Sequence, residues 1–210
     1  MVKAKEREVR SVSCNFEVRD IGEGEKKQTH LQGYAITFDT LSEDLGGFRE
    51  TISRGALDNC DMSDVILDFD HDFSKVLARN NKSSGVGALV LTIDDKGLFF
   101  DAIPTETSYS RDLIENIRNG IVNKCSFVFS VDWSDPEAQK WDWDNGNRGY
   151  DFRTINKLKS ISDVSIVVFP AYEDTETSIY SRAKGKYSDE AEKAKLELRK
   201  KQIANELELY

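Results

Sequence analysis

Apolar and polar residues alternate along several short stretches in the first half of the chain. The alternation covers residues 12–18 and 65–69, and a third strand is expected at residues 31–38. Because a period of two places the apolar side chains on one face of a strand, these stretches predict half-buried β-strands. Two further apolar stretches, 86–93 and 98–103, flank the short polar turn Asp-Asp-Lys-Gly and predict a hairpin.

The second half of the chain combines one helical spacing with longer apolar runs. Apolar residues recur with a helical period over residues 110–119, with Ser110 as the expected N-cap and Gly120 just past the end, which predicts a short helix. An apolar strand is expected at residues 125–131. It leads into a polar insertion that carries tryptophans, residues 133–149.

Two more strands are expected at residues 150–155 and 158–169, and Pro170 ends the second. The chain then holds about seven strands and a few helices in α+β order rather than alternating βαβ units. The expected fold class is therefore α+β, with a mainly antiparallel β-barrel, closed or nearly closed, flanked by a few helices.

Residues 183–210 differ in kind from the rest of the chain. They contain no proline and one glycine, and they interleave Glu, Lys, Ala and Leu, which predicts a helical tail. Ser188 is expected to cap this helix, with carboxylates in the first turn. Because Leu196, Ile203 and Leu207 form only a narrow apolar stripe, a solvated helix that docks weakly is the simplest interpretation.

Composition fits this division. The chain has 210 residues, 39% of them hydrophobic, which suits one domain over residues 1–182 with the charged tail at 183–210 as an appendage. No apolar run approaches the roughly 20 residues of a membrane-spanning helix, and no apolar segment follows the charged start. We therefore expect a soluble protein that is not secreted.

Charge and cysteine content exclude further classes. The formal net charge of -9 disfavours nucleic acid as a partner. Three cysteines without a close pair argue against a disulfide framework or a structural zinc site, and they fit a reducing cytosol.

The chain has two histidines, His30 and His71, that could serve as a general base near neutral pH. His30 opens a strand after a polar run, where an exposed and inert imidazole is expected. His71 ends an apolar strand inside the acidic segment 68–72, whose carboxylates favour its protonated form. His71 is the better candidate, although an inert histidine in an acidic turn explains the segment equally well.

The same acidic segment offers oxygen ligands to a hard cation. On a continuing strand, however, Asp68, Asp70 and Asp72 share one face and His71 takes the other. Since this alternation splits the cluster, a metal site is the lesser interpretation and a solvated acidic turn the simpler one.

Ser126 is the candidate nucleophile because it is one of few polar residues within the apolar strand at 125–131. A buried hydroxyl that bonds the neighbouring backbone is an equally ordinary interpretation. Cys125 is a rival nucleophile, but successive side chains on a strand face opposite sides, so only one of the two can face His71. An isolated cysteine is usually a small core residue.

Asp163 interrupts another apolar strand, and an acid there must be paired or exposed. A carboxylate bonded to the far nitrogen of His71 would orient the base and stabilise its imidazolium form. The alternative is an edge-strand acid that faces water, and the residues alone do not separate the two.

The order histidine, serine, acid along a β-rich chain, in these neighbourhoods, resembles the prohead protease family of tailed bacteriophages, which is similar in fold to the herpesvirus assembly protease. The resemblance covers most of residues 12–181. The segments that carry it are QGYA at 32–35, ISRGAL at 52–57, DHD at 70–72, VLAR at 76–79, DKGL at 95–98, CSFVF at 125–129, DVS at 163–165 and FPAY at 169–172.

The resemblance implies a serine endopeptidase with His71 as the base, Ser126 as the nucleophile and Asp163 as the third catalytic residue. The family often has glutamate at this third position, so the shorter aspartate must reach His71 by a different backbone path. The oxyanion donor is left open between backbone amides near Ser126 and the side chains of Arg79 and Arg153.

The resemblance also implies a biological role. The enzyme is expected to cleave the phage scaffold, or the scaffolding segment of the major capsid protein, and itself during prohead maturation. It implies a homodimer that acts inside the immature prohead in the host bacterial cytoplasm, with no cofactor or metal and no nucleic-acid or membrane partner. Two other functions stay open: a non-catalytic capsid-assembly module of the same fold, and a metal-dependent hydrolase that uses residues 68–72.

Overall fold

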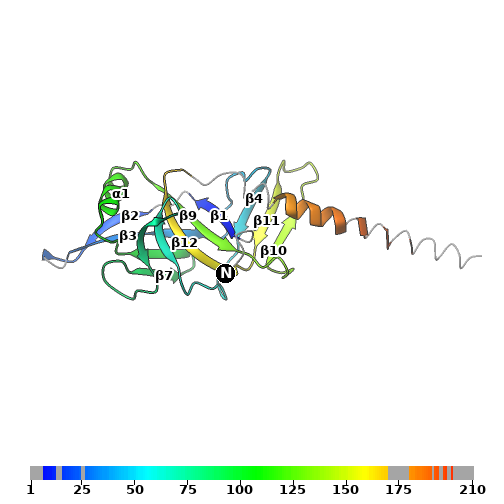
Figure 1. The fold of residues 1–210 in the computed structure, drawn as a ribbon. Helices are drawn as coiled ribbons and strands as arrows, with labels where there is room; N and C mark the ends of the chain where they lie inside the picture. The colour runs from blue at the N-terminus through cyan, green and yellow to red at the C-terminus, as the bar shows by residue number, and fades with distance from the viewer. Residues whose placement is uncertain are drawn as a thin grey trace, which may run out of the picture. The chain divides into compact units, whose positions relative to one another are not determined.

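The structure is a computed structural model that describes residues 7–12, 16–24, 27–169 and 180–190, together with a few single positions up to residue 200. The chain divides into two compact units, residues 1–172 and 173–210. In its described part, the first unit has twelve strands and the helix α1 (Ser108–Arg118) (Figure 1). Within the described ranges, no helix is both long enough and apolar enough to span a membrane.

The central sheet has five strands in the order β1-β9-β12-β5-β6. Strand β12 lies between β9, to which it is antiparallel, and β5, to which it is parallel. Figure 1 shows β9 and β12 side by side at the centre of the unit. The bounds of the five strands are β1 (Arg7–Val12), β9 (Lys124–Ser130), β12 (Ser160–Val167), β5 (Ile66–Phe69) and β6 (Asp72–Arg79).

Two smaller sheets accompany the central one. The four-stranded sheet contains β2 (Glu17–Ile21), β3 (Gln28–Thr37), β8 (Gly97–Ala102) and β7 (Leu89–Ile93), in that order. The three-stranded sheet contains β10 (Gln139–Asp142), β11 (Asp151–Ile155) and β4 (Phe48–Ile52). Helix α1 packs against β2 and β6.

The α+β class is confirmed, but the predicted barrel of about seven strands is wrong. The described residues form twelve strands in three sheets that do not close into a barrel. Two strand pairs, β12 with β5 and β11 with β4, are parallel. A parallel pair needs a long connection, so its partners are far apart in the chain and a local pattern cannot pair them. The likeness to the herpesvirus protease stays a prediction.

Several predicted elements are confirmed and others are wrong. The hairpin forms as β7 and β8, and the strand expected at 31–38 forms as β3. The single strand expected at 12–18 is instead the end of β1 and the start of β2, with residues 13–15 outside the described part. The polar insertion at 133–149 contains β10, whose tryptophan ring, Trp141, packs against Phe48.

The N-terminal caps of the two helices differ from those predicted. Helix α1 begins one turn earlier than expected, because Thr107 rather than Ser110 is its N-cap and accepts the Ser110 N–H. Gly120 follows the helix with a φ of 70°, which an L side chain rarely adopts. In the tail, Ser188 lies inside the helical residues 180–190, where its hydroxyl donates to the carbonyl of Lys184. It is therefore not the cap, and Ile203 and Leu207 lie outside the described residues.

The two faces of the central sheet have different roles. On β9, Phe127 faces the hydrophobic core, and on β12 its partner Val164 does the same. The next residues along, Ser126 on β9 and Ser165 on β12, pair with each other and face the opposite side. This second face is polar yet buried, since both serines are fully inaccessible to solvent.

A cluster of four buried charges joins the central sheet to the three-stranded sheet. Glu8 and Arg10 come from β1, Glu50 from β4 and Arg153 from β11. Arg153 holds both carboxylate oxygens of Glu8, with Nη1–Oε2 at 2.5 Å and Nη2–Oε1 at 2.9 Å. Arg10 bonds Glu50 and also reaches Glu8 at 3.0 Å. The two positive and two negative charges balance, so the cluster as a whole is neutral.

Candidate active site

The predicted nucleophile and base lie in direct contact. The Nε2 atom of His71 is 2.8 Å from the Oγ atom of Ser126, within hydrogen-bond distance. Ser126 is fully buried, whereas one fifth of the His71 side chain is exposed. Cys125, the rival nucleophile, packs in the hydrophobic core on the other face of β9, as the alternation predicted.

His71 reaches Ser126 because the chain turns sharply at the end of β5. Asp70 and His71 both have left-handed backbone conformations, with φ of 61° and 55°. Two consecutive left-handed residues are typical of a tight hairpin turn, here between β5 and β6. The turn also places the His71 N–H 2.9 Å from the Oγ of Ser165, which accepts this hydrogen bond.

This turn overturns the expected split of the acidic segment. The prediction assumed a continuing strand, on which Asp68 and His71 face opposite sides. Because the chain reverses at His71, its ring comes back over the face that carries Asp68. Asp68, His71 and Asp163 place one polar atom each within 4.8 Å of one another. Asp72 instead begins β6 beyond the turn, where its carboxylate bonds Ser74.

Asp163 faces the site because β12 carries a β-bulge. Ile161 pairs with Phe129 and Asp163 pairs with Val128, so Ser162 is the extra residue between them. Residues two apart on a regular strand share a face, but the bulge changes this. Ile161 therefore packs in the core, while Asp163 turns to the face of Ser126. Asp163 is 1% exposed, so the expectation of a water-facing acid is wrong.

The carboxylate of Asp163 lies beside the second ring nitrogen of His71. The Nδ1–Oδ1 distance is 3.2 Å, although the two groups are poorly aligned for a hydrogen bond. Burial alone lowers the pKa of His71, but the contact with Asp163 and the charge of that carboxylate outweigh it and raise the pKa above the usual 6.5. The protonated form of the base is therefore stabilised.

The hydroxyl of Ser126 has two possible acceptors for its single proton. Its Oγ lies 3.0 Å from the carbonyl oxygen of Arg10 on β1, to which it donates, as well as 2.8 Å from His71 Nε2. A hydroxyl has one proton, so it donates either to the carbonyl or to the imidazole. Nucleophilic activation requires the second arrangement, with a neutral His71 as the acceptor.

Asp68 is a residue of this face whose position the sequence did not predict. It pairs with Ser165 on β12, and Ser165 pairs with Ser126 on β9, so the three residues form one row across β5, β12 and β9. From the sequence alone, we expected Asp68 to lie in a solvated acidic turn. The partner strand that gives it this position is about a hundred residues away, and no local signal identifies it.

Neither arginine proposed as an oxyanion donor is available in this structure. Arg153 is fully buried and committed to Glu8 and Glu50. Arg79 bonds both carboxylate oxygens of Asp64 on the surface, at 2.6 and 2.5 Å. Backbone amides near Ser126 therefore remain the candidate donors.

The other histidine has a partner of its own. His30 was expected to be exposed, but its side chain is only 15% exposed and its Nδ1 lies 2.7 Å from Asp101. The pair joins β3 to the neighbouring β8. Neither residue belongs to the site around Ser126.

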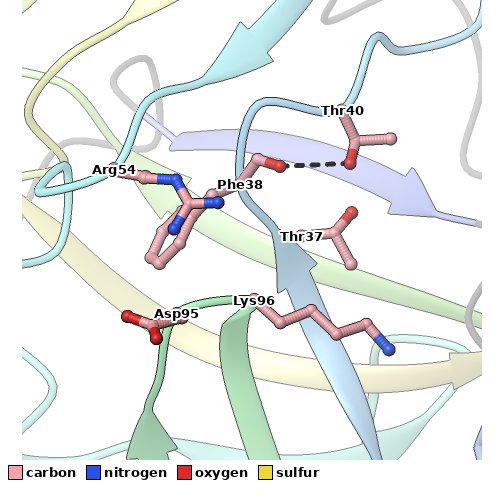
Figure 2. A pocket seen from close by; sticks show the side chains of 6 residues that line it. All are labelled: Thr37, Phe38, Thr40, Arg54, Asp95 and Lys96. Atoms are coloured by element: carbon pink, nitrogen blue, oxygen red, sulfur yellow. Dashed lines mark hydrogen bonds between the residues drawn. The ribbon is translucent and has the colours of Figure 1, made fainter.

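A separate surface pocket of about 350 Å³ lies where the end of β3 meets the turn between β7 and β8 (Figure 2). Figure 2 shows the hydroxyl of Thr40 bonded to the carbonyl of Phe38 at its rim. Its lining does not include Ser126, His71 or Asp163, so it is not the site described above. The residues that line it are Thr37, Phe38, Thr40, Arg54, Asp95 and Lys96.

A serine hydroxyl, an imidazole and a carboxylate in contact in this order form the arrangement by which serine proteases generate a nucleophile. The protein is a serine protease. Its sequence matches the family described as Caudovirus prohead serine protease over residues 6–190, and the chain belongs to that family. The resemblance found from the sequence segments is confirmed.

One solved structure similar to this chain is that of the bacteriophage T4 capsid assembly protease, gp21. The two share 12% sequence identity with a TM-score of 0.49, over 79% of this chain and 98% of the other. No curated protein sequence gives a significant match.

Proposed function

We propose that the protein is an endopeptidase of phage head maturation in which Ser126 is the nucleophile, His71 the general base and Asp163 the residue that orients the base. The observation that carries the assignment is the continuous contact from Ser126 Oγ through both nitrogens of His71 to the carboxylate of Asp163.

The chemical steps follow from this contact. His71 Nε2 takes the proton of Ser126 as Oγ attacks the carbonyl carbon of a substrate peptide bond. The charge of Asp163 stabilises the imidazolium that results. His71 then gives its proton to the leaving amine as the peptide C–N bond breaks, which leaves an acyl-enzyme on Ser126. In the second half, His71 takes a proton from a water molecule as the water oxygen attacks the acyl carbon, and it returns this proton to Ser126 Oγ as the ester C–O bond breaks.

The substrates we propose are the scaffold protein, or the scaffolding segment of the major capsid protein, and the protease chain itself. Membership of the prohead protease family supports this choice. The homodimer and the place of action, inside the immature prohead in the host cell, stay predictions.

The test is co-production of the protease with the capsid protein of the same phage, read by intact mass. Wild-type protein should cut the capsid protein at discrete sites, and Ser126→Ala and His71→Ala should leave it whole. Cys125→Ala is the matched control, because it changes the neighbouring residue on the opposite face of β9 and should retain cleavage. Full cleavage by Ser126→Ala would refute the assignment.

Two further arms of the experiment address the other functions. If the protein were a non-catalytic assembly module, neither the capsid protein nor the protease chain would be cut in any sample. If it were a metal-dependent hydrolase, a strong chelator would abolish cleavage. We expect cleavage that the chelator does not change.

A further inference from the structure

Asp68 is an acid of the central sheet that is inaccessible to solvent. It is 0% exposed, and neither of its carboxylate oxygens makes a well-formed hydrogen bond among the described residues. A buried carboxylate without such bonds costs several kcal/mol unless a nearby charge compensates it. Asp68 therefore needs a compensating positive charge nearby, and the candidates for this charge are its nearest ionisable neighbours.

Two ionisable groups face Asp68, one from β12 and one from the turn after β5. They are Asp163 and His71, and the polar atoms of the three residues all lie within 4.8 Å of one another. The remaining close neighbour, Ser165, is uncharged, and its hydroxyl accepts the N–H of His71. The acid of the turn, Asp70, is exposed to solvent. Among the described residues, the imidazolium of His71 is thus the cation placed to balance Asp68.

We propose that Asp68 is a positioning residue of the active site, a second carboxylate that acts together with Asp163 to stabilise the imidazolium of His71. The proposal rests on the assignment of His71 as the base. It extends that assignment, because the Ser-His-Asp arrangement uses one carboxylate beside the base and this site has two.

The protonation states follow from the geometry. Two carboxylates so close together repel each other, and burial adds to this effect. Burial raises the pKa of Asp68 to about 6, with the neighbouring charge of Asp163 adding to the rise and the Ser165 hydroxyl opposing it. Above pH 6 Asp68 is mainly ionised, and His71, whose pKa is raised as well, becomes the neutral base only at a pH above its own raised value. When His71 takes the proton of Ser126, the new positive charge forms between two negative charges.

The experiment measures kcat/KM against pH for a peptide that contains a cleavage site, in the wild type and in Asp68→Asn. Loss of the charge of Asp68 should lower the pKa of His71, so the acidic limb of the profile should move to lower pH. The plateau should fall about tenfold, as expected for the loss of one pKa unit of imidazolium stabilisation. A residue with only a structural role would lower the plateau without moving the limb.

Asp70→Asn is the matched control. It removes one negative charge next to His71 in the sequence, but from an exposed position where water screens it, and asparagine tolerates the left-handed backbone there. Asp70 also contributes to the raised pKa of His71, but less than Asp68, so the acidic limb of its profile should move clearly less than that of Asp68→Asn. Asp68→Ser, which is also uncharged but smaller, should move the limb in the same direction as Asp68→Asn.

The proposal is wrong if the limb in Asp68→Asn and Asp68→Ser coincides with that of Asp70→Asn. This outcome is distinct from failure of the catalytic assignment itself. In the same assay Ser126→Ala and His71→Ala report on that assignment, and their inactivity beside an unshifted Asp68→Asn would contradict the role of Asp68 alone.

Discussion

At the scale of single residues, the reach of Asp163 decides how well His71 is oriented. Its carboxylate comes within 3.2 Å of Nδ1 although aspartate is one methylene shorter than the glutamate expected in this family. The bulge at Ser162 turns Asp163 to the face of Ser126, and from there its short side chain reaches the ring of His71. The poor alignment of the contact means that a substrate complex has room to tighten it.

Two replacements of Asp163 distinguish the effect of its charge from the effect of its size. Asp163→Ala should lower kcat by about a thousandfold, because His71 loses the group that fixes its tautomer and stabilises its imidazolium. Asp163→Glu keeps a carboxylate, so its kcat should fall much less. Steady-state kinetics of both variants measures the difference, and equal losses would mean that Asp163 does not orient the base.

The three residues of the proposed site could be named from the sequence, but their surroundings could not. His71, Ser126 and Asp163 were candidates as polar residues in or at the end of apolar strands, and the resemblance to the prohead proteases ranked them above the alternatives. Asp68 was not among them, since its position depends on two left-handed residues at 70 and 71 and on pairing with a distant strand. Aspartate and histidine give a weak signal for such a turn, in contrast to the glycine that usually marks one.

At the scale of elements, the bulge in β12 sets which side chains meet. Val164 and Ile166 face the core and Asp163 and Ser165 face the site, and both assignments depend on one extra residue. The hydrophobic run at 158–169 predicted the strand correctly. The sequence also carries a signal of the bulge that the strand prediction did not use, because the polar residues Ser162 and Asp163 stand together where the alternation has room for one.

Removal of the extra residue should leave the faces of its neighbours unchanged. Deletion of Ser162 makes Ile161 and Asp163 consecutive residues of a regular strand, which face opposite sides as they do now, so the variant should still cleave the capsid protein. Ser162→Ala keeps the chain length and removes a hydroxyl that has no hydrogen-bond partner among the described residues, so it should also cleave like the wild type. Loss of cleavage by a folded deletion variant, with Ser162→Ala active, would show that Asp163 needs the bulge for more than the face it takes.

At the scale of the whole molecule, the neutral cluster of Glu8, Arg10, Glu50 and Arg153 links two sheets through buried charge. Burial raises the pKa of Glu8, but the charge and hydrogen bonds of Arg153 outweigh it, and the pKa lies below its usual value of 4.5. Glu8 therefore contributes stability that is fully present above pH 4.5 and is lost as the pH falls through the folded-state value.

Arg153→Met should destabilise the fold by about 3–5 kcal/mol, because it leaves two buried carboxylates with one arginine. Lys157→Met is the control, since Lys157 forms ion pairs with Asp135 and Glu137 on the surface and should cost about 1 kcal/mol or less. Urea unfolding at neutral pH measures both. Similar values for the two variants would mean that the cluster does not hold the sheets together.

The strand order of the central sheet also bears on when activity can arise during synthesis. Ser126 lies on β9 and His71 follows β5, but these strands are not neighbours, because β12 lies between them. A nascent chain that ends before residue 160 already contains the nucleophile and the base, yet lacks the strand that joins their two halves of the sheet. On the proposed roles of Ser126 and His71, we therefore expect the catalytic contact to form only after β12 has been synthesised, and a chain that ends before residue 160 to be inactive.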